Sequence, residues 1–252
     1  MSYPTSDFHS RQNAFIPAEN LKDVSVLIVG CGAIGRNVAS NVARLGVKSI
    51  TLVDHDIVEA HNIVPQNWKK QDCGRPKVDV LAEEIIAQMG EDLIEVKPFS
   101  KKWAPRVVGA DTEYTAVWST VDNIDVRRVI YNYYRDKADH FFDVRIGYTV
   151  AQILTVQDLR NTDDWYLKTI FPAAESASWG CIQPMSNYIA NIAAGASVNQ
   201  FANIMGKKGW PANKMLSYCA ISSTLLVEKP NEYFGAIIDN NKNAKAEETV
   251  SS

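Results

Sequence analysis

The chain has 252 residues, of which 46% are hydrophobic, enough for one large domain with a sizeable core. Its formal net charge of −3, with both signs interspersed, argues against nucleic acid as a partner. It contains no apolar run long enough to span a membrane and no signal-peptide pattern at the N-terminus, so we expect a cytoplasmic protein without a membrane partner. Its four cysteines are far apart and form no C-x-x-C motif, which predicts neither a cysteine-built zinc site nor a disulfide framework.

A glycine-rich turn between a strand and a helix is the main signal. The apolar run from Val24 to Val29 leads into Gly30, Gly32 and Gly35, spaced G-x-G-x-x-G, and helical periodicity then continues to Gly46. Such glycines permit a tight turn, close approach of the backbone to a phosphate, and close packing of helix on strand. A second apolar strand, 49–53, ends at Asp54, where a carboxylate can accept hydrogen bonds from ribose hydroxyls. The order predicts a nucleotide-binding βαβ unit.

Polar side chains follow this unit in an irregular segment. Loops beside a nucleotide pocket commonly hold the reactive groups, although each position taken alone is also typical of a solvated surface. Lys77 begins a helix that extends to Gly90, at the end where the helix dipole disfavours a cation, so a phosphate docked there would explain it. The candidate residues of the segment are Asp56, Asn62, Gln66 and Lys77.

Two further strands, 93–99 and about 115–120, are predicted next, and ligands of doubly wound sheets bind at the carboxyl ends of strands. Asp122 and Asn123 would therefore lie at the mouth of the site. Either could also cap the following helix, and both roles can hold together.

The second half of the chain predicts an antiparallel extension. Segments 140–147 and 149–156 read as paired strands, 162–171 as a short helix, 186–205 as a helix with a small-residue face, and 215–229 as two edge or hairpin strands. The fold class is therefore α/β, a Rossmann-like doubly wound sheet that is mostly parallel and carries an antiparallel C-terminal extension. We expect an N-terminal arm (1–20), a single domain (21–235) and a disordered tail (236–252).

Taken together, these motifs resemble the ThiF/MoeB family of adenylating enzymes, which includes ubiquitin-activating enzymes. The resemblance covers roughly residues 8–205. It lies in GCGAIG, in LVDHDIVEAHNIVPQ, in GRPK against the family's G-x-x-K, and in DNIDVR against D-N-x-x-x-R. Within the domain, the resemblance implies a nucleotide-binding half (21–147) and a carrier-binding half (148–235).

The resemblance implies ATP-dependent activation of the C-terminal carboxylate of a ubiquitin-like or sulfur-carrier protein with a flexible C-terminus. Asp122 would hold Mg²⁺, Lys77 would contact the phosphates, and Arg127 would support the loop after Asp122. Arg11, in a segment similar to the family's R-Q, would reach across a homodimer to the partner's ATP. The implied ATP-site residues are Gly30, Gly32, Ala33, Gly35, Asp54, Asp56, Asn62, Gln66, Lys77 and Asn123.

The chain departs from the family pattern in three places. The arginine of the family's S-N-L-x-R-Q motif falls on Pro65, so one phosphate cation is missing, and Lys69, Lys70 or Arg75 would have to substitute. The family's paired C-x-x-C zinc motif is absent, so we expect no structural zinc. The usual serine is His61, to which we assign no consequence.

Three residues keep two interpretations. Cys181 lies in a crossover loop where some family members form a thioester or persulfide, which makes it a candidate nucleophile, but a cysteine is often only a small buried hydrophobe. Asp143 and Arg145 are either substrate-site residues or an internal ion pair.

Two functions compete with adenylation. A nicotinamide-dependent oxidoreductase would explain Gly30 to Asp54 but leaves the N-x-x-x-Q, G-x-x-K and D-N motifs unexplained. A non-catalytic partner subunit would explain Pro65, whereas the presence of Asp122 and Lys77 argues against it.

Overall fold

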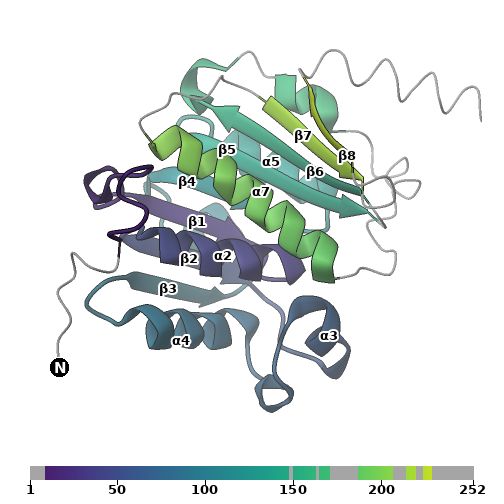
Figure 1. Cartoon of the computed structure of the whole chain (residues 1–252). Helices are drawn as coiled ribbons and strands as arrows, with labels where there is room; N and C mark the ends of the chain where they lie inside the picture. Colours follow the sequence, from purple (N-terminus) through teal and green to yellow (C-terminus); the bar gives the residue numbers. More distant parts are fainter. Residues whose placement is uncertain are drawn as a thin grey trace, which may run out of the picture.

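The fold is a single mixed sheet with helices on both faces, seen in a computed structural model that describes residues 9–147, 150–162, 165–170, 187–206, 214–219 and 224–228 (Figure 1). The sheet has eight strands in the order β3-β2-β1-β4-β5-β6-β7-β8. The strands are β1 (Ser25–Val29), β2 (Ser49–Asp54), β3 (Glu95–Ser100), β4 (Tyr114–Ser119), β5 (Ala138–Gly147), β6 (Val150–Gln157), β7 (Lys214–Cys219) and β8 (Thr224–Glu228).

The strands from β3 to β5 run parallel, and β6, β7 and β8 continue the sheet in antiparallel fashion. This confirms the predicted Rossmann-like α/β class with an antiparallel C-terminal extension. Strands β1, β2 and β4 are buried on both faces and must be covered by helices twice, whereas the edge strand β3 is largely exposed. Strand pairs β5–β6 and β7–β8 confirm the two predicted antiparallel pairings.

Helices α2, α4 and α7 cover one face of the sheet, and α5 covers the other (Figure 1). The longer helices are α2 (Ala33–Leu45), α4 (Lys77–Met89), α5 (Ile124–Tyr134) and α7 (Asn187–Met205). The short ones are η1 (Ala18–Asn20), η2 (Ala60–Asn62), α3 (Ile63–Gln66), η3 (Lys70–Asp72), η4 (Pro105–Val107), η5 (Leu159–Asn161) and η6 (Trp165–Thr169). Helix η6 is a 3-10 helix within the segment where a short helix is predicted.

Helix α7 uses its small residues for close packing. Ala190, Ala193 and Ala194 are fully buried, and the helix lies against α2 and across β5 and β6. Phe201 on the same face contacts the Trp118 ring edge-on at a centroid distance of 5.1 Å. The sheet and α2 are therefore the partners of the small-residue face.

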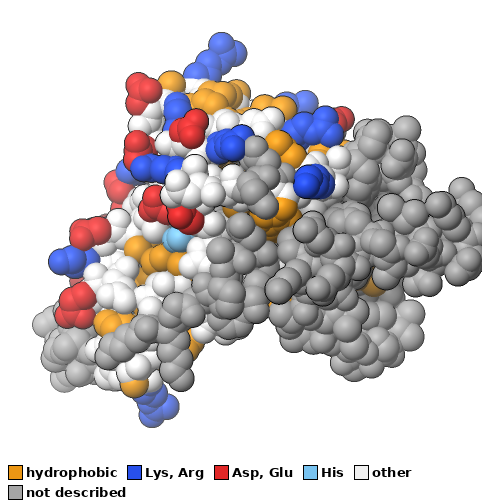
Figure 2. Space-filling view, turned by 90° about the horizontal axis from the view of Figure 1, so that it is seen from above, with side chains coloured by type: hydrophobic (Ala, Val, Ile, Leu, Met, Phe, Trp, Pro, Cys, Tyr) orange, Lys and Arg blue, Asp and Glu red, His pale blue; other side chains and the backbone are white. Residues whose placement is uncertain are grey.

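The surface carries both charge signs. On the described part of the face in Figure 2, acidic and basic side chains are interspersed with apolar ones. None of the described helices combines the length and apolar composition that a membrane crossing requires.

Candidate nucleotide site

The glycine loop between β1 and α2 is held against the loop that follows β4, residues 120–123 (the β4 loop). Gly30 has a φ of +92°, and a Cβ there would come within 2.9 Å of the Thr120 carbonyl group. At Gly35 a Cβ would come within 1.8 Å of the Gly30 carbonyl oxygen, so only glycine permits this packing of helix on strand. Gly32 is the N-cap of α2 without a side-chain cap, followed by buried Ala33, which leaves N–H groups of the first turn for an anion.

Asp54, the last residue of β2, lies beside this loop. Its Oδ2 accepts the Cys31 N–H at 2.6 Å, and its Oδ1 accepts the Asp56 N–H at 2.9 Å. The ligand atoms of Asp54, His55 and Asp56 all lie within 4.8 Å of one another. Asp54 thereby joins the turn after β2 to the glycine loop.

Lys77 is buried at the first position of α4 and paired with Asp56. Its Nζ donates to Asp56 Oδ2 at 2.8 Å, and its backbone N–H donates to the Asp56 carbonyl oxygen at 3.0 Å. Partial burial would raise the pKa of the Asp56 carboxyl, but the hydrogen bond and charge of Lys77 outweigh it and lower the pKa below its ordinary value. The Asp56 carboxylate is half exposed, whereas the Lys77 side chain is buried.

Gln66 and Asn62 have different surroundings. Gln66 lies over Gly32, with a side chain 4.0 Å from the Cβ position of that glycine, and its Oε1 accepts the Trp68 Nε1–H at 3.1 Å. Asn62 is buried, and its Oδ1 accepts the Glu59 N–H at 3.1 Å, which fixes the turn before α3. Of the two amides, Gln66 is the one that faces Gly32 of the glycine loop.

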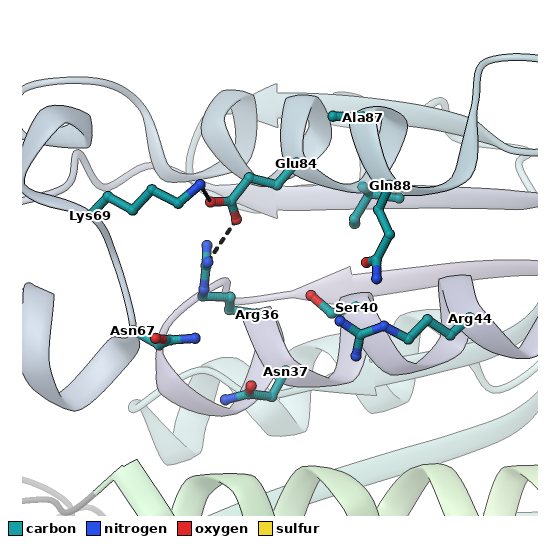
Figure 3. A pocket seen from close by; sticks show the side chains of 10 residues that line it. Arg36, Asn37, Ser40, Arg44, Asn67, Lys69, Glu84, Ala87 and Gln88 are labelled. Carbon is teal, nitrogen blue, oxygen red and sulfur yellow. Dashed lines mark ion pairs between the residues drawn. The ribbon is translucent and has the colours of Figure 1, made fainter.

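The structure pairs two of the cations proposed to replace the missing arginine with acids of α4. Lys69 Nζ lies 2.9 Å from Glu84, which also pairs with Arg36 at 2.7 Å (Figure 3). Arg75 pairs with Glu83 on the same helix. Lys69 and Arg36 line a pocket of 390 Å³ between α2 and α4, whose other lining residues are Asn37, Ser40, Arg44, Asn67, Glu84, Ile85, Ala87 and Gln88. Lys69 and Arg75 are thus both paired with acids of α4 in this structure.

The β4 loop carries the predicted metal ligand. Thr120 Oγ1 donates to the carbonyl oxygens of Val29 (3.1 Å) and Gly30 (2.6 Å), which joins this loop to the glycine loop. Asp122 is exposed and makes no hydrogen bond or ion pair with any residue that the structure describes. Asn123 caps α5 by accepting the N–H groups of Asp125 and Val126, which confirms one of its two predicted roles.

The remaining predicted residues lie away from the loop or outside the description. Asp143 and Arg145 are buried and form an internal ion pair at 2.6 Å, one of their two interpretations. Arg11 is exposed in the N-terminal arm, whose Gln12 donates to the carbonyl oxygen of Leu45 at 2.6 Å. Cys181 and the tail 236–252 lie outside the described residues, so both remain predictions.

Sequence reasoning missed Thr120, Arg36 and Trp68. Arg36 directly follows the glycine triplet and stacks over the Trp68 ring at 4.1 Å, which ties α2 to the segment after α3. The available signals were a threonine just after an apolar strand and an arginine in the first turn of a helix that packs on a sheet.

A Rossmann-like sheet with a glycine loop, an acid-ended β2 and a polar β4 loop places the chain among α/β proteins with a dinucleotide-type loop. The chain belongs to the ThiF family, whose model matches residues 9–232.

Individual relatives match less of the chain. It is 23% identical over 122 residues to the NEDD8-activating enzyme E1 catalytic subunit of Arabidopsis thaliana, covering 46% of this chain and 26% of the relative. It is 30% identical over 112 residues to the adenylyltransferase and sulfurtransferase MOCS3 of Sus scrofa, covering 44% and 24%. The match spans about a quarter of these curated relatives.

Solved structures match at the level of fold. Escherichia coli MccB with MccA-N7isoASN superposes with a TM-score of 0.73 at 18% identity, covering 90% of this chain and 72% of MccB. PaaA superposes with a TM-score of 0.72 at 19% identity, covering 91% and 84%.

Proposed function

We propose that this chain is an ATP-dependent adenylyltransferase that activates the C-terminal carboxylate of a ubiquitin-like protein, sulfur carrier or peptide as an acyl-adenylate. The supporting observation is the contact between the glycine loop and the β4 loop. Thr120 binds the Gly30 carbonyl oxygen two residues before Asp122, and Asp54 binds the glycine loop from the other side. A nucleotide held at the start of α2 would therefore have Asp54 on the side of its ribose and Asp122 on the other side, where a metal ion could bridge the carboxylate and the phosphates.

The reaction brings two anions together. A carboxylate oxygen of the acceptor attacks the α-phosphorus of ATP, the bond to the β-phosphate oxygen breaks, and pyrophosphate leaves with the electron pair. Asp54 would accept from the ribose, while Lys77 and the α2 N–H groups would neutralise phosphate charge. Asp122, which has no partner among the described residues, fits as a Mg²⁺ ligand, and the ion would supply further neutralisation.

The relatives support a carboxylate at a polypeptide terminus as the acceptor. MccB has been solved with ATP and with MccA, and MOCS3 is an adenylyltransferase and sulfurtransferase. We propose these classes of acceptor for this chain, with Cys181 as a candidate for a subsequent covalent transfer.

Arg11 is proposed to serve a partner subunit in a homodimer. Gln12 is anchored at the C-terminal end of α2, and α2 has 13 residues, so the arm lies about 20 Å along the helix from the chain's own glycine loop. An arginine at that end is poorly placed for the ATP of its own chain and is better suited to a neighbouring one.

Pro65 supports a second candidate, a non-catalytic partner subunit. The engagement of Lys69 and Arg75 with α4 leaves the lost arginine without an evident replacement from either residue. This candidate predicts no response of the isolated chain to nucleotide.

Thermal unfolding with Mg²⁺-ATP, and separately with NAD, tests the proposal. A ligand at about one hundred times its Kd adds about 2.7 kcal/mol to the free energy of unfolding. We expect Mg²⁺-ATP alone to stabilise the chain, and Asp122→Ala to abolish that shift. Asp125→Ala, three residues on and also exposed, is the matched control and should retain it. A shift with NAD alone would favour an oxidoreductase, and no shift with either would favour the non-catalytic subunit.

A further inference from the structure

A fully buried carboxylate, Asp143 on β5, lies at the centre of a cluster that no predicted ATP contact requires. Its Oδ1 accepts from Arg127 of α5. Its Oδ2 accepts from Arg145 Nε at 2.8 Å, Arg145 Nη2 at 2.6 Å and the Tyr166 hydroxyl at 2.8 Å. The two oxygens thus accept four hydrogen bonds from three side chains, which fixes the carboxylate in one orientation.

Arg127 connects this cluster to the β4 loop. Arg127 donates to the carbonyl oxygens of Ser119 at 3.1 Å and Val144 at 3.0 Å, and also to that of Val121. Val121 immediately precedes Asp122 in the chain. Arg127, which is oriented by Asp143, therefore holds the backbone directly before Asp122.

Arg145 and Tyr166 connect the Asp143 carboxylate to η6. Arg145 donates to the carbonyl oxygen of Thr169 at 3.0 Å and to its hydroxyl at 3.1 Å, and Tyr166 lies in the same short helix. Burial and the nearby Asp143 charge raise the pKa of Tyr166 well above its ordinary value, so its hydroxyl remains a donor. Burial alone would raise the pKa of Asp143, but Arg127 and Arg145 outweigh it and lower the pKa, so the acceptor remains charged.

We infer that Asp143, held by Arg145 and Tyr166, is a positioning residue for the loop that carries Asp122. The inference rests on the proposed function, in which Asp122 binds the metal. Replacing a buried ion pair by apolar residues is often neutral for stability, so net stability alone does not account for this cluster. Apart from Asp143, the described partners of the Arg127 guanidinium are backbone carbonyls, of which Ser119 and Val121 flank the start of the loop and Val144 lies on β5.

Calorimetric titration of the full chain with ATP, in excess Mg²⁺ and in EDTA, tests the inference. The ratio of the two affinities isolates the metal's contribution, which a purely structural residue does not change. We expect Asp143→Asn to lower this ratio about tenfold, in line with losses at other groups that orient metal ligands, and to leave the affinity in EDTA unchanged. The matched control is Asp139→Asn, the same change at an exposed position of β5, which should keep the wild-type ratio.

A second variant covers the case in which Asp143→Asn does not fold. Tyr166→Phe removes one of the four hydrogen bonds and keeps the ring that packs on Tyr131 and Phe141, at centroid distances of 4.5 Å and 5.2 Å. It should lower the ratio by a smaller factor. A folded variant of either kind with the wild-type ratio would overturn the inference. A wild-type chain that binds no ATP would overturn the proposed function and the inference with it.

Discussion

Cys31 lies between two glycines of the glycine loop and is fully buried. Burial, and secondarily the Asp54 charge, raise the pKa of its thiol well above the ordinary value, so the thiolate form is suppressed. We predict that iodoacetamide at pH 8 alkylates exposed Cys73 and spares Cys31 in the folded chain, as measured by peptide mass spectrometry. If Cys31 were labelled as fully as Cys73 in the native chain, and not only in urea, the glycine loop would be open.

Lys77 is the cation whose removal should separate binding from stability. Hydrogen bonds to charged groups are worth about 1.5–3 kcal/mol, so Lys77→Gln should weaken ATP binding about tenfold or more. The unfolding free energy should change little, because the Asp56 carboxylate left behind is half exposed and remains hydrated. Calorimetry and urea unfolding measure the two effects, with Lys22→Gln, an exposed lysine before β1, as the control. Unchanged ATP affinity would exclude Lys77 from the phosphate site.

Asp143 should contribute to the free energy of unfolding, and this contribution should be lost in acid. Its pKa is lower in the folded chain than the unfolded value of about 3.9, so the contribution is complete above that value and is lost as the pH falls through the folded pKa. The stability advantage of wild type over a folded Asp143→Asn variant should therefore shrink below about pH 4. Urea unfolding between neutral and acid pH measures it, and an advantage independent of pH would contradict the assignment.

Helix α2 depends on glycine at its start in a way that α7 does not. A Cβ at Gly35 would meet the Gly30 carbonyl oxygen, whereas a Cβ at Gly195 in α7 meets nothing within 4 Å. We predict that Gly35→Ala lowers the melting temperature and abolishes the ATP response. Gly195→Ala should stabilise the chain by up to about 1 kcal/mol through helix propensity. A Gly35→Ala variant with an unchanged melting temperature and ATP response would refute the close packing of α2 on β1.

The elements near the glycine loop could be predicted because their signals are local. The apolar run of β1, the helical period of α2 ending at Gly46, and the β2 run ending at Asp54 all agree with the structure within a residue or so. The pairing of Lys69 with Glu84 and the contacts of Asp143 with Arg127 and Tyr166 could not be predicted, because each contact joins segments that meet only in the folded chain. For the same reason Trp68 and Thr120 were missed.

Across the whole molecule, the parallel half of the sheet brings separate segments to one edge. The loops after β1, β2 and β4 meet there through Thr120 and Asp54, while β6, β7 and β8 extend the sheet away from it. The ordering of parallel strands thus explains why motifs far apart in the sequence form one candidate site. The acceptor surface has no comparable motif, since docking depends on shape and charge spread over many positions.

Pyrophosphate exchange into ATP tests the central claim, carboxylate adenylation, most directly. The probes would be a ubiquitin-like protein ending in Gly-Gly, a sulfur carrier and a short peptide, each with a free and with an amidated C-terminus. We predict that one class of free carboxylate supports exchange, that its amidated form does not, and that Asp122→Ala abolishes the exchange. Exchange that is indifferent to amidation, or that persists in Asp122→Ala, would contradict the account.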